Sequence, residues 1–94
     1  MKTHVLKCDP EPFDAVWRGD KRHEVQNNDR DYEQGDRVVL HEYDRTENPN
    51  SHDRPIGYSG HVITATIGHV TRGPDYGLPP GLCVFSLLRV EKAS

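Results

Sequence analysis

The sequence passes from a turn into a strand at Gln34-Gly35-Asp36-Arg37-Val38-Val39-Leu40-His41-Glu42-Tyr43. Glycine followed by aspartate is typical of a turn, because glycine adopts conformations closed to other residues and aspartate can bond its own backbone. The run after it is apolar and partly β-branched, which predicts a strand over residues 37–43. A single strand cannot bury its own apolar side chains, so we expect further strands to pair with it.

Four other segments have the composition of strands. The segment at residues 61–70 is β-branched and alternating, whereas residues 83–90 form a nearly continuous apolar run, which favours a central place in a sheet. The remaining two are short. The four predicted strands are Thr3–Lys7, Arg22–Gln26, His61–Val70 and Cys83–Val90.

One helix is predicted between the first two of these strands. Asp9-Pro10 is a suitable start, since proline is tolerated in the first turn, and Gly19 is a suitable end. Phe13, Val16 and Trp17 follow the i, i+3, i+4 spacing of an apolar helix face. We therefore expect Trp17 in the core.

Three segments are predicted to lie outside regular structure. Residues 44–60 contain almost nothing apolar except Ile56 and Tyr58, and residues 71–81 carry three glycines and three prolines, so we expect a long surface loop and a second loop. Residues 91–94 are expected to form a polar tail.

The count of about five strands and one early helix predicts the fold class. The simplest way to bury both faces of so small a sheet is to curl it into a barrel, with the helix against one opening. The sequence thus predicts an α+β fold with a small β-barrel, and its 94 residues predict a single domain over residues 1–94.

Composition excludes several classes of function. The formal net charge of −3 argues against a protein that coats nucleic acid by bulk electrostatics, so any nucleic-acid contact must be local. No run of about 18 apolar residues is present, which predicts no membrane span and a cytoplasmic protein. Cys8 and Cys83 lack CxxC spacing, and His61 and His69 belong to no HExxH or HxH pattern, so neither a cofactor nor a metal site is expected.

An ordered set of motifs resembles a known family. The most specific of them are a Gly-x-Lys-x-x-Glu stretch after a short helix and an Asn-Asp-Arg-Asp-aromatic turn that leads to Gly-Asp. The set consists of His4-Val5-Leu6-Lys7, Pro12-Phe13-Asp14-Ala15-Val16, Gly19-Asp20-Lys21-Arg22-His23-Glu24-Val25, Asn28-Asp29-Arg30-Asp31-Tyr32, Gly35-Asp36 and Leu40-His41-Glu42-Tyr43-Asp44. It resembles a small bacterial and phage domain-of-unknown-function family, the 3850 type, within the ASCH branch of the PUA-like superfamily.

The resemblance implies a pseudo-barrel with a cleft between barrel and helix. Relatives in this superfamily bind RNA or modified bases, and one bacterial branch hydrolyses acetylcytidine. That branch is similar to this chain at Lys21, but it has a threonine where Glu24 stands and a later acidic residue that only Asp75 could match. Gln26 stands where the family usually has arginine, which removes a bidentate phosphate clamp, and His23 where it usually has a large apolar residue.

Lys21 and Glu24 are the principal candidates for chemistry. Strand alternation puts Glu24 on one face with Arg22 and Gln26, three residues after Lys21, so the lysine and the glutamate are expected to converge at the mouth of the cleft. A carboxylate beside the lysine favours binding of phosphate or carbonyl oxygens, and Glu24 could read an exocyclic amine. The same pair equally fits a partly solvated structural ion pair worth about 0–1 kcal/mol.

Two loop tyrosines and one arginine are secondary candidates. Tyr58 and Tyr76 lie beside glycines, where a ring could stack on a base, although packing on the barrel rim is the commoner outcome. Arg30 stands between two aspartates and is expected to fasten its own loop rather than to bind phosphate.

Three functions remain open from the sequence. The leading hypothesis is a module that binds RNA or a modified nucleotide through Lys21, Arg22, Glu24, Gln26 and Tyr76. The first alternative is a small amidohydrolase acting on acetylated cytidine, with Lys21 and Glu24 as catalytic residues. The second alternative is a protein-interaction module, which would expose an apolar patch.

Overall fold

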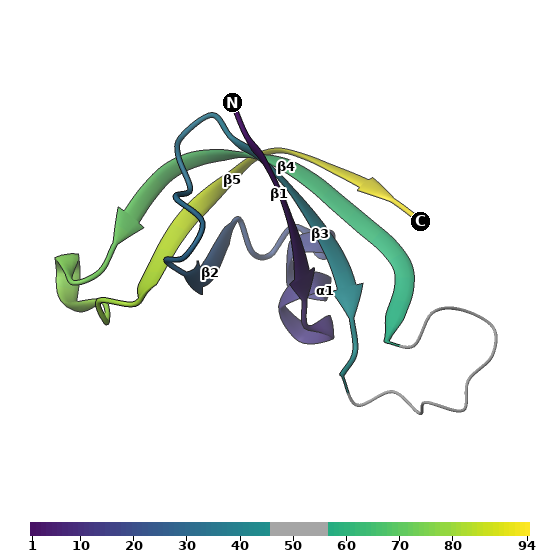
Figure 1. Ribbon diagram of the computed structural model, residues 1–94. Coiled ribbons are helices and arrows are strands. Elements are labelled where there is room, and N and C mark those ends of the chain that lie inside the picture. The colour runs from purple at the N-terminus through teal and green to yellow at the C-terminus, as the bar shows by residue number, and fades with distance from the viewer. Residues whose placement is uncertain (46–56) are drawn as a thin grey trace.

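The computed structural model describes residues 1–45 and 57–94 (Figure 1). Their regular structure is mostly strand, with one α-helix and one short 3₁₀ helix. In chain order the elements are β1 (Thr3–Cys8), α1 (Pro10–Arg18), β2 (His23–Asn27), β3 (Arg37–Tyr43), β4 (Tyr58–Arg72), η1 (Asp75–Gly77) and β5 (Leu82–Ala93).

The strands form one mixed sheet in the order β1-β3-β4-β5-β2. β1 pairs with β3 in parallel, from Thr3 opposite Arg37 to Cys8 opposite Glu42, whereas the other three pairings are antiparallel. The central position predicted for the last strand is confirmed, because β5 lies between β4 and β2. β1 and β2 are the two edges of the sheet.

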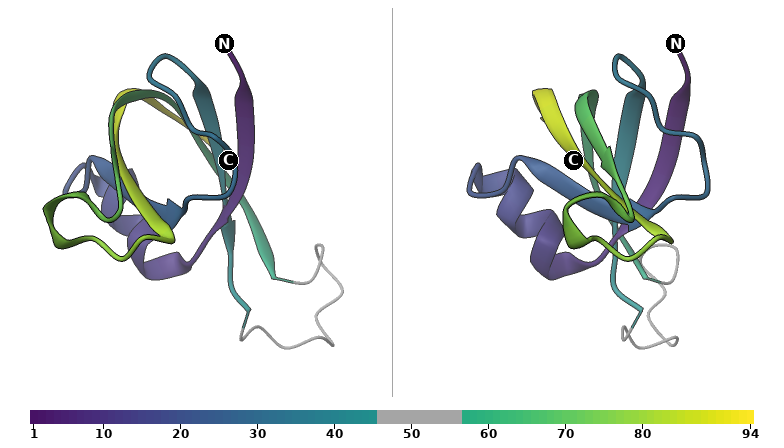
Figure 2. Two further views of the ribbon diagram at one scale, coloured as in Figure 1. Left: turned by 60° about the vertical axis from the view of Figure 1, so that its left-hand side comes forward. Right: turned by 90° about the vertical axis from the view of Figure 1, so that its left-hand side faces the viewer.

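The sheet curls into a half-barrel. Figure 2 shows β4 and β5 arching over, with α1 lying beneath the curled strands. The predicted α+β class with a curled sheet is therefore confirmed. The barrel stays half open because its two edge strands, β1 and β2, are not hydrogen-bonded neighbours in the sheet.

The core fills the inner face of this half-barrel. Alternate side chains of the strands point inward, and α1 adds Phe13 and Val16. Trp17, which we expected in the core, packs against it while remaining partly exposed, and it stacks on His61 at 5.2 Å between ring centroids. The buried apolar side chains are Leu6, Cys8, Phe13, Val16, Tyr32, Val38, Leu40, Ile63, Ala65, Ile67, Cys83, Phe85 and Leu87.

The ends of two strands correct the prediction. Residues 58–60, expected in a loop, begin β4, and residues 91–93, expected in a polar tail, complete β5. Both ends are held by pairing, since residues 91–93 pair with residues 62–64 of β4 and Tyr58 pairs with Tyr43 of β3. Hydrogen bonding along the ladder thus outweighs the polar composition. Residues 46–56 of the predicted long loop lie outside the described residues.

The helix α1 begins and ends where the sequence predicts. Pro10 occupies its first turn, and Gly19 follows it in the left-handed conformation with φ of 92°. Within the described part of the chain, no helix has the length and apolar character needed to span a membrane.

Candidate functional site

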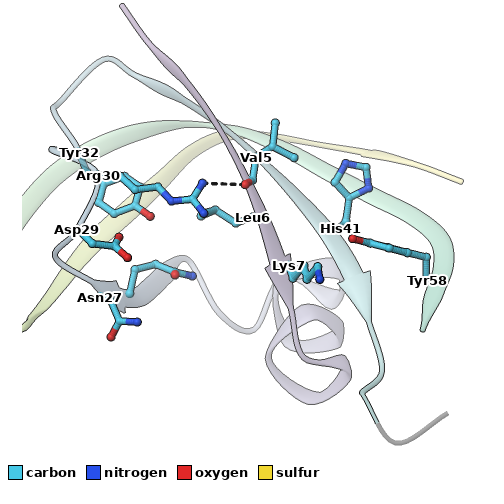
Figure 3. Close-up of a pocket in the computed structure, with 10 residues that line it drawn as sticks. Val5, Leu6, Lys7, Asn27, Asp29, Arg30, Tyr32, His41 and Tyr58 are labelled. Carbon is cyan, nitrogen blue, oxygen red and sulfur yellow. Dashed lines mark hydrogen bonds between the residues drawn. The ribbon is translucent and has the colours of Figure 1, made fainter. Parts of the chain in front are cut away.

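Two adjoining pockets lie at β1 and β2, the edge strands of the half-barrel, and one of them extends over β1 to His41 of β3 and Tyr58 of β4. The first, called here the Glu24 pocket, measures about 360 Å³ and is lined by residues of both edges, including Lys21 and Glu24. The second, called the Arg30 pocket, measures about 480 Å³ (Figure 3). Lys7 and Gln26 line both pockets, so the two adjoin at these side chains. We call the pair the edge groove.

The end of α1 positions Lys21 at this groove. After Gly19 reverses the chain, the backbone N–H groups of Asp20 and Lys21 both donate to the carbonyl of Ala15, at 2.9 and 3.1 Å. β2 begins two residues later, at His23. The lysine is therefore fixed at the junction of helix and strand, and its side chain is free to reach β2.

Glu24 lies at the floor of its pocket and is 3% exposed. Its Oε1 lies 3.9 Å from Nζ of Lys21 and accepts a long contact of 3.9 Å from the Cys8 thiol. Its Oε2 accepts a hydrogen bond of 3.1 Å from Nε2 of Gln26. The predicted meeting of Lys21 and Glu24 is thus present, together with Gln26 from the same face of β2.

Burial controls the protonation of this cluster. It raises the pKa of Glu24 above its ordinary value, and this effect outweighs the nearby Lys21 charge and the Gln26 hydrogen bond, which both favour the ionised form. Burial, reinforced by the neighbouring Glu24, also raises the pKa of Cys8 to about 12. The thiol is therefore protonated and unsuited to nucleophilic chemistry near neutral pH.

The face that β2 turns inward is the polar one. Alternation correctly separates Glu24 and Gln26 from Val25, but Val25 points outward and is 48% exposed. The apolar side chain of Val25 would have favoured the opposite orientation, with Val25 inward and Glu24 outward. A polar side chain turned into the half-barrel is what creates the Glu24 pocket.

Arg22, Asp75 and Tyr76 do not line the edge groove. Arg22 turns back to α1 and donates from Nη1 to the carbonyl of Val16 at 3.1 Å. Asp75 and Tyr76 belong to η1, where Tyr76 is 95% exposed. Of the five binding residues suggested by the sequence, the structure brings together Lys21, Glu24 and Gln26.

Lys7 is the groove residue that sequence reasoning missed. It points outward from β1, and its ammonium lies 4.4 Å from the centroid of the Tyr43 ring and 5.8 Å from that of Tyr58. Tyr58 itself packs edge-on against Tyr43 at 4.9 Å, on the rim of the sheet. The sequence signal for this placement is strand alternation in β1, which puts Lys7 on the outward face. The pairing of Lys7 with His41 then shows which residues of β3 lie beside it.

Arg30 fastens its loop to the edge of the sheet. Its Nη1 donates to the carbonyl of Val5 at 3.0 Å, and Figure 3 shows the guanidinium reaching across to that strand. Asn27 and Asp29 lie beside it in the same pocket. The contact holds the loop after β2 against β1 in the absence of direct pairing between β1 and β2.

A buried pair on the same inner face of the sheet, next to the core, anchors the start of β1. Nε2 of His4 lies 2.9 Å from Oδ2 of Asp36, and this carboxylate also accepts the backbone N–H groups of Lys2 and Glu33 at 3.0 and 3.2 Å. Burial alone would raise the pKa of Asp36, but these hydrogen bonds, with His4 the strongest, lower it to about 2. The cluster joins the first strand to the turn before β3.

Possible metal ligands are scattered. Within residues 1–45 and 57–94, no three histidine, cysteine or acidic side chains are grouped so as to hold a metal ion. His61 lies against Trp17, with its Nδ1 3.6 Å from Oε1 of Glu42. His69 lies along the same strand, at a separate hollow near Arg72.

Comparison with known proteins gives a family match over most of the chain. The family described as "Domain of unknown function (DUF3850)" matches residues 3–87. The "Uncharacterized 12.9 kDa protein in GpA 3'region" of Escherichia phage P2 is 45% identical over 42 residues. That alignment covers 45% of this chain and 38% of the phage protein, so it spans well under half of the relative's length.

Proposed function

This chain belongs to the DUF3850 family of domains of unknown function, and from that premise we propose that it binds RNA or a modified nucleotide in the edge groove. The observation that carries the proposal is the convergence of Lys21, Glu24 and Gln26 at the floor of one pocket. A volume of about 360 Å³ lies within the range of roughly 300–1,000 Å³ common to small-ligand pockets. A nucleoside is of suitable size.

The chemistry of the three side chains suits the edge of a base. An ionised Glu24 accepts a hydrogen bond from an exocyclic amine, as carboxylates do from cytosine, whereas the ammonium of Lys21 and the amide of Gln26 donate to carbonyl or ring nitrogen acceptors. The raised pKa of Glu24 adds a second mode, because the protonated acid can donate. Cytosine and its modified forms are the bases that this set fits best.

The wider relationship to the ASCH branch of the PUA-like superfamily is part of this proposal. A half-barrel whose helix stands beside a polar pocket supports it. Because Gln26 replaces a usual arginine, we place phosphate recognition on other side chains and base recognition on Gln26. A cytoplasmic location, where RNA and nucleotides are available, also belongs to the proposal.

Calorimetric titration with cytidine, acetylcytidine and a short single-stranded RNA tests the proposal. Glu24→Gln and Lys21→Met are each expected to weaken binding roughly 10- to 100-fold, the loss typical of one hydrogen bond to a charged group. Glu91→Gln and Lys92→Met, at exposed positions on β5, are the matched controls and should leave binding unchanged. Absence of binding by all three ligands would overturn the proposal.

A small amidohydrolase acting on acetylated cytidine is the second candidate. The raised pKa of Glu24 beside an ammonium favours it, since a carboxyl that holds its proton more tightly than usual is better suited to act as a general acid. Asp75, the acidic residue suggested by resemblance, does not line the groove; Asp9 does, and its Oδ1 pairs with Arg45 at 2.9 Å. Release of acetate from acetylcytidine, abolished by Glu24→Gln, would establish this activity in place of simple binding.

A protein partner is the third candidate. It would require a continuous exposed apolar patch. Among the described residues, the exposed large apolar side chains are spread over the N-terminal segment, β2, η1 and β5, namely Met1, Val5, Val25, Tyr76 and Leu88. This distribution favours the edge groove over a protein-binding face.

A further inference from the structure

The edge groove continues beyond the pocket that holds Glu24. Along β1, residues 5–7 line the Arg30 pocket and residues 7–9 line the Glu24 pocket; along β2, residues 24–26 line the Glu24 pocket and residues 26–27 line the other. The pairings of the sheet make β1 and β2 antiparallel to each other. Following the chain, β1 reaches the Arg30 pocket first and β2 reaches the Glu24 pocket first. The two pockets therefore lie one after the other along the two edges.

The two pockets are spaced like successive units of a chain. The β1 segments that line them are centred on residues 6 and 8, two residues apart, which corresponds to a step of roughly 7 Å at the rise of an extended strand. This is the scale of one nucleotide step in an extended single strand. Volumes of about 480 and 360 Å³ each leave room for one base and sugar.

Lys7 occupies the junction of the pockets with its charge available. Within the described ranges, no acidic side chain forms an ion pair with it, and its ammonium lies over the faces of Tyr43 and Tyr58. An ammonium held over aromatic rings stays partly hydrated and can exchange that water for a phosphate oxygen. Lys21, by contrast, is engaged by Glu24.

The Arg30 pocket has the groups that a second nucleotide needs. Arg30 uses one N–H on the Val5 carbonyl, and a guanidinium has five. Asn27 and Gln26 provide amides, and Tyr58 provides a ring at the pocket wall (Figure 3). Base stacking on such a ring is sequence-tolerant, so this pocket is suited to hold a neighbouring base without selecting it strongly.

We propose that the edge groove binds a single-stranded oligonucleotide of at least two nucleotides, with one base in each pocket and the connecting phosphate on Lys7. This inference rests on the proposed function, and it names the ligand class as a strand instead of a free nucleoside. Because one connecting phosphate is bound by Lys7, the salt dependence is shallow, with a slope of log affinity against log salt of about −0.7 for one phosphate on a single strand.

A length series tests the inference. Affinities are measured by calorimetry for cytidine, the ribodinucleotide CpC and a four-nucleotide RNA, at several salt concentrations. We expect CpC to bind at least 10-fold more tightly than cytidine. Lys7→Met should remove most of that gain, so that the ratio of CpC affinity to cytidine affinity falls towards 1, and should reduce the salt slope by about 0.7. Lys92→Met, which removes another lysine held over an aromatic ring, is the matched control.

The outcomes separate this inference from the function on which it rests. If cytidine binds and CpC binds no more tightly, or if Lys7→Met weakens both ligands equally, the two-nucleotide groove is wrong while the binding proposal stands. If neither ligand binds, both fail. Thermal unfolding of Lys7→Met shows whether a loss arises from misfolding, and the deoxyribose form of the dinucleotide shows whether the groove prefers RNA or single-stranded DNA.

Discussion

Nζ of Lys21 lies 3.9 Å from Oε1 of Glu24, and the two side chains differ sharply in exposure, at 21% for the lysine and 4% for the glutamate. The ammonium therefore forms the outer part of the pair and the carboxylate the inner part. This arrangement differs from a solvated surface pair, because the carboxylate depends on its few neighbours for the stabilisation that water would otherwise provide. The next two predictions follow from it.

Glu24→Gln should leave the fold intact and raise its stability at neutral pH by about 1 kcal/mol. The pKa of Glu24 in the folded protein lies above the ordinary 4.5, so its contribution to stability is fully present below pH 4.5 and is lost as the pH rises through the folded pKa. Thermal unfolding at pH 4 and pH 7 checks this. A destabilisation of equal size at both pH values would contradict it.

Lys21→Met should destabilise the protein by about 1–2 kcal/mol at pH 7, because it leaves the buried carboxylate without its ammonium. The loss should shrink near pH 4, where Glu24 becomes neutral. The double variant Lys21→Met/Glu24→Gln should recover most of the stability. Additive losses in urea unfolding would show that the two side chains do not interact, and Lys92→Met is the control for loss of a surface lysine.

Asp36→Ala should destabilise the protein by about 3 kcal/mol at pH 7, because it removes a buried acceptor shared by His4 and two backbone N–H groups. The pKa of Asp36 is lowered from 3.8 to about 2, so its contribution is present above pH 3.8 and is lost as the pH falls through about 2. Acid unfolding should therefore bring the variant and the natural protein together at low pH. Asp14→Ala, on the surface of α1, should cost no more than about 1 kcal/mol.

Gly73→Ala should destabilise the protein by more than 2 kcal/mol, since a Cβ at this position would lie 1.9 Å from the backbone carbonyl oxygen of Pro79. The Pro79 carbonyl belongs to the backbone, so it cannot move aside for the added methyl group as a flexible side chain could. Gly81→Ala, at the end of the same loop, meets nothing within 4 Å and is the matched control. Equal denaturation midpoints for the two variants would show that the loop is not packed as described.

Local patterns in the sequence predict much of the fold because they depend on neighbouring residues. The bounds of α1 follow from Pro10 and Gly19, and the strand at residues 37–43 follows from its own composition. The long-range pairing of β1 with β3, and of residues 91–93 with β4, was not predictable in this way. Composition records what a segment prefers, whereas these pairings depend on which segments meet.

The candidate site was predicted in part for the same reason. Spacing alone suggested that Lys21 and Glu24 meet, and they do. Alternation separates the two faces of a strand without saying which one is buried, so the inward turn of Glu24 and the outward turn of Val25 were not foreseen. Lys7 reaches the groove only through the curl of the sheet, which no local pattern encodes.

A two-dimensional amide NMR titration with acetylcytidine, followed by a short mixed-sequence RNA, tests the central claim most directly. The account predicts shifts concentrated at residues 5–9 and 21–30, on the two edges of the half-barrel, with little change at Tyr76. Shifts confined to the separate hollow near His69 and Arg72, or no shifts with either ligand, would contradict a nucleotide site between β1 and β2.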